Sequence, residues 1–162
     1  MKEYLILRIL LAFHLAGLTI MAGTTIIDFF TFKTFCRLMS DDINKASGLL
    51  PLMSAYGSFV RIGAVILVLT GASMFIISDG IWWQQLWFKI KMGLVVLLIL
   101  NGMLVGNRNG VKLRSMAYDG LPDIMLRTAD VRDNLNRFYI TQLVIFFLII
   151  LLSAVKYDRN GM

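Results

Sequence analysis

The stretch IWWQQLWFKIKMGLVVLLILNGMLVG, residues 81–106, decides the fold of this chain. It opens with an aromatic cluster and continues into the uncharged apolar run Met92–Leu100. A run of this length and apolarity predicts a helix that crosses a lipid bilayer. Lys89 and Lys91 lie within its first turns, where a lysine either extends to the headgroups or faces a polar interior.

Three further stretches have the same character. The 162 residues are 58% hydrophobic with a mean hydropathy of +0.75, whereas a soluble domain is about half apolar. The apolar windows are Ile9–Ile27, Met53–Ile77, Trp82–Gly106 and Phe138–Val155. Since one span needs about 20 apolar residues, we predict a single all-α transmembrane domain over residues 1–162, an integral membrane four-helix bundle. The predicted helices cover residues 5–35, 53–77, 82–106 and 138–156.

Composition also excludes several classes of protein. The first window is longer than the apolar region of a signal peptide and no clear cleavage site follows it, so we expect it to be retained. The single cysteine, Cys36, excludes an intrachain disulfide and a cysteine-based metal cluster. The net charge of +6 suits anionic lipid headgroups rather than nucleic acid in so apolar a chain.

The connections between the windows predict how the helices follow one another. Ser78-Asp79-Gly80 predicts a tight turn, so the second and third helices form an antiparallel hairpin. The polar segment Asn107–Arg137 contains Pro122-Asp123, a helix start, and predicts a short interfacial helix that leads into the last span. Tryptophans 82, 83 and 87 predict an interfacial belt. Small residues predict close helix contacts: Ala16, Gly17, Ala22, Gly23, Gly57, Gly63, Gly71 and the pair Gly102/Gly106.

The distribution of basic residues predicts the orientation. Four spans place both termini and the 78–80 turn on one side, here called the terminal side, and the other connections on the opposite loop side. The terminal side carries six Lys and Arg residues and the loop side carries ten. The positive-inside rule therefore predicts cytoplasmic loops and termini outside.

Two ionisable residues are predicted to lie at one depth. His14, the only histidine, and Lys91 each follow the start of a span by about nine residues, roughly 14 Å along the helix axis. The first and third helices run parallel, so both side chains lie in the terminal-side half. A functional interpretation makes His14 a ligand or proton carrier and Lys91 an anion-binding group. The alternative is that His14 hydrogen-bonds a neighbouring helix and Lys91 extends to the headgroups.

A second polar layer is predicted towards the loop side. Asp28 lies late in the first helix, Arg61 early in the second and Asn101 late in the third. We predict that Asp28 and Arg61 form a structural polar pair inside the bundle. Methionines offer further axial ligands to a bound metal, although packing or lipid contact explains any one of them equally well: Met21, Met74, Met92 and Met103.

Two segments resemble a known family. Residues 86–95, LWFKIKMGLV, resemble the W-x-x-x-K-[LM]-x-x-V segment of the HemJ-type protoporphyrinogen oxidases, which belong among small CopD-like bacterial membrane proteins. Residues 11–15, LAFHL, followed by Ala22-Gly23, are similar to the family's first-helix K-A-F-H…A-G segment. The chain differs where the family has a tryptophan before A-G and a histidine after the third-helix run.

The resemblance implies a four-helix protein of the bacterial inner membrane with a functional histidine and lysine, which are His14 and Lys91 here. It further implies haem b bound through His14, and oxidation of protoporphyrinogen IX coupled to a quinone or another respiratory-chain partner. Apart from the resemblance, four short helices leave little interior for a tetrapyrrole, so we expect that a second copy of the chain, in a homo-oligomer, could complete the pocket. Two other functions remain open from the sequence: a non-enzymatic subunit or scaffold of a membrane complex, and a small CopD-type transporter.

Overall fold

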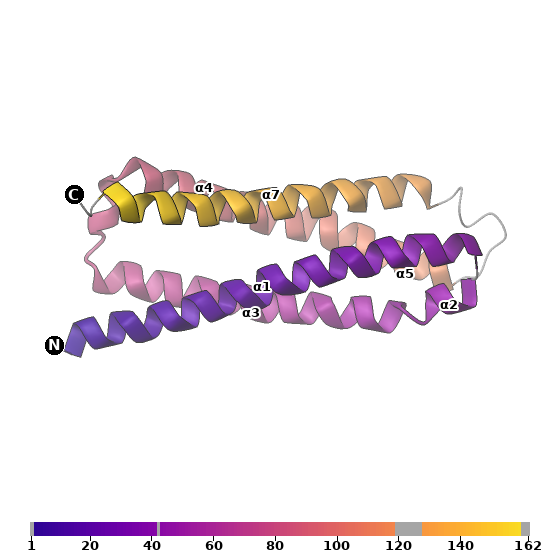
Figure 1. Cartoon of the computed structure of the whole chain (residues 1–162), viewed down its shortest axis with the longest axis horizontal. Helices are drawn as coiled ribbons and strands as arrows, with labels where there is room; N and C mark the ends of the chain where they lie inside the picture. Colours follow the sequence, from indigo (N-terminus) through magenta and orange to yellow (C-terminus); the bar gives the residue numbers. More distant parts are fainter. Residues whose placement is uncertain (1, 42, 119–127, 160–162) are drawn as a thin grey trace.

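The computed structural model describes residues 2–41, 43–118 and 128–159. The chain folds into long helices joined by short connections (Figure 1). The α-helices are α1 (Lys2–Asp41), α2 (Ile43–Ser47), α3 (Leu50–Ile77), α4 (Leu86–Asn101), α5 (Arg108–Tyr118) and α7 (Ala129–Arg159). A 3₁₀ turn, η1 (Ile81–Gln84), precedes α4, and a π-helical turn, η2 (Gly102–Asn107), joins α4 to α5.

Four helical stretches are long and apolar enough to cross a membrane, and the protein is a multi-pass membrane protein. They are Glu3–Met39, Lys45–Ile77, Leu86–Met116 and Ala129–Ala154. Most of their apolar side chains point away from the protein interior, where the bilayer hydrocarbon contacts them. The predicted all-α bundle of four spanning helices is confirmed. Helix α7 extends furthest beyond its predicted bounds, since it begins at Ala129, and α1 continues to Asp41. Helix α4 begins at Leu86, later than predicted.

The spanning helices pack as two pairs. The extended contact is between α1 and α3, and a second one joins the α4–η2 stretch to α7, while α1 also contacts α7 (Figure 1). The start of α1, the end of α7 and the α3–α4 turn lie at one end of the molecule. Asp79 and Gly80 have φ of 49° and 66°, which confirms the predicted tight turn. Although α3 and α4 are antiparallel, each packs mainly against a different helix.

Glycines set the distance between α1 and α3. A Cβ built at Gly63 would lie 2.9 Å from the Gly17 carbonyl oxygen and 3.0 Å from the Met21 backbone nitrogen. Only glycine fits so close to a neighbouring backbone. The predicted close contact is therefore confirmed for this pair. Gly23 and Gly57 have nothing within 4 Å of such a Cβ and make no comparable contact.

Buried apolar side chains form two clusters at different depths. The loop-side cluster includes Phe32, Phe35, Leu113 and Leu135, all at most 2% exposed. The central cluster consists of Met21, Leu98, Ile145, Phe146 and Ile149. In the terminal-side third, no hydrophobic side chain is buried among residues 3–20, 71–80, 83–97 and 150–154, which are the described parts of that region. The fully buried apolar side chains of the described residues thus lie in the central and loop-side parts of the bundle.

The two glycines of the predicted G-x-x-x-G pair have different surroundings. A Cβ at Gly106 would lie 2.5 Å from the ring of Phe138 on α7, whereas one at Gly102 would meet nothing within 4 Å. Asn109 donates to the Val105 carbonyl across the end of the π-helical turn, at 2.9 Å. Close packing between the third span and α7 therefore depends on one glycine of the pair.

This difference predicts unequal effects of leucine at the two positions. Gly106→Leu is expected to lower the free energy of unfolding by about 2 kcal/mol, because Phe138 must leave its rotamer or α7 must move. Gly102→Leu, its control on the same turn, is expected to change it by at most about 0.5 kcal/mol. Reversible unfolding in mixed detergent micelles measures both. Equal values for the two variants would contradict the packing described for Gly106.

The polar segment after the third span is described in part. Residues 108–118 form α5, which continues the third span and packs against α7. Residues 129–137 form the first turns of α7. The helix start predicted at Pro122 and Asp123 lies outside the described residues.

Candidate functional site

His14 joins α1 to α3 through a hydrogen bond. Its side chain is half-buried, and its Nδ1 lies 2.9 Å from the Oγ1 of Thr70. The Thr70 hydroxyl lies 2.6 Å from the Ile66 carbonyl oxygen, one turn earlier on α3. A hydroxyl has one proton, and donating it to Ile66 leaves Thr70 to accept from the imidazole. This network assigns the proton to Nδ1 and leaves the lone pair on Nε2.

Gly71 provides the surface on which the imidazole lies. A Cβ at this position would be 3.4 Å from His14 Cε1 and 3.8 Å from His14 Nδ1. The ring therefore packs directly against the backbone of α3, beside the hydroxyl that holds it. The carbonyl of Leu67 also interacts with the imidazole. The carbonyl of Leu67, the hydroxyl of Thr70 and the backbone at Gly71 thus fix the position and tautomer of His14. All three lie on one face of α3.

Lys91 lies near His14, on α4. Its side chain is half-buried, and its charge acts on the imidazole across the space between the helix pairs. Lys89, by contrast, is exposed. Lys91 is therefore close enough to His14 to act on the imidazole electrostatically, although no hydrogen bond joins the two side chains. They lie in the terminal-side region where the described apolar side chains are not buried.

The predicted pair of Asp28 and Arg61 does not form. Tyr139 on α7 donates to Asp28 Oδ2 at 2.7 Å, and Arg61 is exposed and donates to Ser58 of its own helix at 3.0 Å. The two residues have suitable depths, but they face different directions. Asp28 lies on the side of α1 that faces α7, whereas Arg61 lies on the exposed side of α3.

Asn101 is bound to α7. Its Nδ2 donates to the Gln142 side-chain oxygen at 2.9 Å and lies 3.4 Å from the Phe138 carbonyl oxygen. Gln142 is only 3% exposed. Sequence reasoning missed Thr70, Tyr139 and Gln142 as partners, although a glutamine within an apolar span is a recognisable signal of an interhelical hydrogen bond.

The donors present do not suit a metal ion held by several protein side chains. Among the residues that the structure describes, no three His, Cys, Asp or Glu side chains gather into a metal-binding group. Of the methionines considered as ligands, Met21 is 4% exposed and packs in the central cluster, and Met103 is 65% exposed. Met92 is exposed, and Met74 is half-buried on α3.

An aromatic cluster closes the terminal side of the α3–α4 turn. Phe75 stacks on Phe88 at 5.7 Å between ring centroids, and Trp83 meets both rings edge-on. Trp87 packs edge-on against Phe88 and donates to Gln85. The side chain of Trp82 lies outside those described. The aromatic side chains thus tie the start of the third span to the end of α3.

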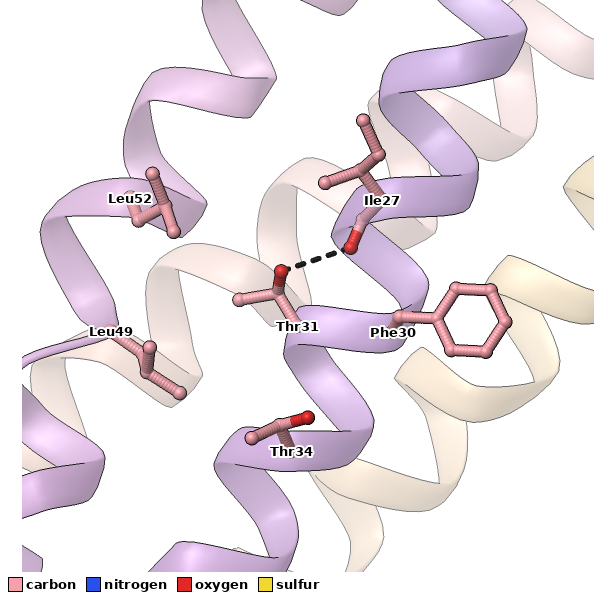
Figure 2. A pocket seen from close by; sticks show the side chains of 6 residues that line it. All are labelled: Ile27, Phe30, Thr31, Thr34, Leu49 and Leu52. Carbon is pink, nitrogen blue, oxygen red and sulfur yellow. Dashed lines mark hydrogen bonds between the residues drawn. The ribbon is translucent and has the colours of Figure 1, made fainter.

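A separate groove lies on the loop side, away from His14. It has a volume of 290 Å³ and is open and largely apolar (Figure 2). Its walls come from α1 and from the start of α3: Ile27, Phe30, Thr31, Thr34, Leu49 and Leu52. The Thr31 hydroxyl donates to the Ile27 carbonyl at 2.9 Å. The groove holds no ionisable side chain, so it contributes no chemistry to the His14 site.

Comparisons with known proteins give no information on the function of the His14 site. No family model matches this chain, and neither a curated protein nor a solved structure is significantly similar to it.

Proposed function

We propose that this protein is a tetrapyrrole-binding membrane oxidoreductase in which His14 binds the iron of haem b and Lys91 binds a carboxylate of the same ligand. The observation that carries the proposal is the hydrogen bond of His14 Nδ1 to Thr70, at 2.9 Å. A histidine bound to a metal through Nε2 is held in this way, by a partner on its other ring nitrogen. Lys91, whose charge acts on His14 from α4, would supply a cation for a propionate.

The residues at the site fit a haem better than a bare metal ion. A bare ion needs several protein ligands, whereas haem iron already has four porphyrin nitrogens and takes one or two axial ligands. His14 meets the latter requirement as a single axial ligand, and Lys91 is left to bind a carboxylate of the haem. The absence of a multi-residue metal group in the described chain gives no support to a CopD-type copper transporter.

A bound haem b supplies one-electron transfer, and the residues of the chain bind and orient it. The hydrogen bond that His14 Nδ1 donates to Thr70 would set the direction of the imidazole, and Lys91 would bind the acidic edge of the tetrapyrrole. We place the substrate among reduced tetrapyrroles such as protoporphyrinogen IX, with a quinone or a respiratory-chain protein as acceptor. The loop-side excess of Lys and Arg, ten against six, supports an orientation with the termini outside. The family resemblance suggests a bacterial inner membrane location.

An optical spectrum of the purified protein tests the proposal. Wild type, expressed with haem supplied, is expected to show a Soret band and the reduced bands of haem b after dithionite. His14→Ala is expected to lose both, because the axial ligand is gone. Arg61→Ala serves as the control, since Arg61 is exposed and bound to Ser58. A colourless wild type would overturn the haem assignment, and an unchanged His14→Ala spectrum would remove His14 as the ligand.

The lysines of the third span provide a matched comparison in the same experiment. Lys91→Met is expected to weaken haem retention, because the half-buried cation near His14 is lost. Lys89→Met, at an exposed position of the same helix turn, is expected to retain it. Haem titration of the two variants measures the difference. Equal retention would show that Lys91 does not contact the ligand.

A second candidate function is a non-enzymatic subunit or scaffold. Gly57, Gly93 and Gly102 have open space around the Cβ position, and such glycines let another helix approach closely. This candidate predicts that a colourless wild type still assembles with a partner or a second copy. It further predicts that His14→Ala and Lys91→Met leave that assembly unchanged.

A further inference from the structure

The seam between α1 and α7 contains a line of polar side chains that is separate from the His14 site. Tyr139 is 4% exposed and donates to Asp28 at 2.7 Å. Two turns further towards the loop side, Cys36 of α1 interacts with Arg132 of α7. Asn136 lies on α7 between Arg132 and Tyr139, one helical turn from each, so the three share one face. A line of polar side chains thus runs along the seam from its loop-side end to Asp28, beside the buried apolar cluster of Phe32, Phe35 and Leu135.

Three buried polar atoms of this seam lack a hydrogen-bond partner among the described residues. They are Asp28 Oδ1, Arg132 Nε and Asn136 Oδ1. A buried polar group without a partner costs about 1–3 kcal/mol, so native proteins supply one. Two of the three atoms are acceptors and one is a donor. Water donates two protons and accepts others, which matches this set.

The charges around Asp28 argue against a metal cation at this place. Arg114 of α5 acts electrostatically on Asp28, and Arg132 lies further along the same seam. From α3, the charged residue is Arg61, which is exposed and bound to Ser58. The hydroxyl of Tyr139 also faces the carboxyl and donates to it. A small neutral ligand suits this environment, because Arg114 already offsets part of the charge of the carboxylate.

We propose that the α1–α7 seam binds a chain of water molecules through which Asp28 exchanges protons with the loop-side surface. Arg132, Asn136 and Tyr139 bind and orient this water, and Arg132 is half-buried where the seam approaches the surface. The inner end is closed by apolar packing, since Met21, Leu98 and Phe146 lie between the seam and the His14 region. Asp28 is thus a proton-binding site with access from one side. The inference is independent of haem binding.

Infrared difference spectroscopy of the protein in lipid tests this site. As the buffer is moved from alkaline to acid, a carboxylic-acid C=O band from Asp28 is expected to appear, and it shifts promptly when H₂O buffer is exchanged for D₂O. Asp28→Asn is expected to lose the band. Asp133→Asn, which changes an exposed carboxyl of the same bundle end, is expected to keep it. Tyr139→Phe is expected to move the band, because it removes the donor to Oδ2.

Other results of the infrared experiment would overturn the water chain or proton exchange at Asp28. A band that appears but does not shift in D₂O would show a sealed carboxyl and overturn the water chain. A band that is absent over the whole pH range would overturn proton exchange at Asp28. Should Asp28→Asn fail to fold, Asn136→Leu keeps the test decisive, because it leaves the carboxyl and removes a water-binding oxygen. Slower isotope exchange in Asn136→Leu supports the proposal, and an unchanged rate contradicts it.

Discussion

Gly63→Leu is expected to lower the free energy of unfolding by about 3 kcal/mol or more, the upper end of the range for overpacked contacts. The reason is the identity of the neighbouring atoms. A Cβ at Gly63 would lie 2.9 Å from the Gly17 oxygen and 3.0 Å from the Met21 nitrogen, and these are backbone atoms of α1. A flexible side chain could turn aside, but here one whole helix must move away from the other. The α1–α3 contact, which is the most extended in the fold, would be lost.

The control for this variant is Gly57→Leu on the same helix. A Cβ at Gly57 would have nothing within 4 Å, so the leucine extends into lipid and the free energy of unfolding changes by at most about 0.5 kcal/mol. Reversible unfolding in mixed micelles, followed by circular dichroism, compares the two variants. Similar stabilities for both would show that α1 and α3 do not approach closely at Gly63.

Gly71→Leu is expected to weaken haem binding by roughly 10- to 100-fold, the effect typical of disturbing the groups that orient a metal ligand. A Cβ at Gly71 would lie 3.4 Å from His14 Cε1. The outer atoms of leucine would therefore occupy the volume of the imidazole and separate it from Thr70. Haem titration of the purified variant measures the affinity. The variant removes no polar group, so the loss reports the position of His14.

Two further variants identify the cause of that loss. Gly71→Ala adds only the Cβ, at a distance of ordinary contact, and is expected to retain most of the affinity. Ala72→Leu adds the same bulk at the next, exposed position and is expected to bind haem as wild type does. Equal affinities for Gly71→Leu and Ala72→Leu would contradict the packing of His14 on α3. A colourless wild type would instead overturn the proposal that the protein binds haem.

The sequence predicts much of the His14 site, because the depth of a residue in the membrane follows from its number of residues after the start of a span. The rise of a helix is constant, so the positions of His14 and Lys91 in parallel spans predict one level. In the structure the charge of Lys91 acts on His14. Counting does not determine which way a helix is rotated. Asp28 therefore meets Tyr139 rather than Arg61, although all three lie at suitable depths.

The sequence by itself determined the four spans, the turn at Ser78–Gly80 and the common level of His14 and Lys91. These depend on local properties, since each span must be apolar and must satisfy its own backbone hydrogen bonds in lipid. Only the tertiary structure decided the pairing of α1 with α3 and of α4 with α7. It also decided the partners Thr70 for His14, Tyr139 for Asp28 and Gln142 for Asn101. Those choices depend on how glycines and side chains fit between rotated helices, and that fit exists only after the helices have packed.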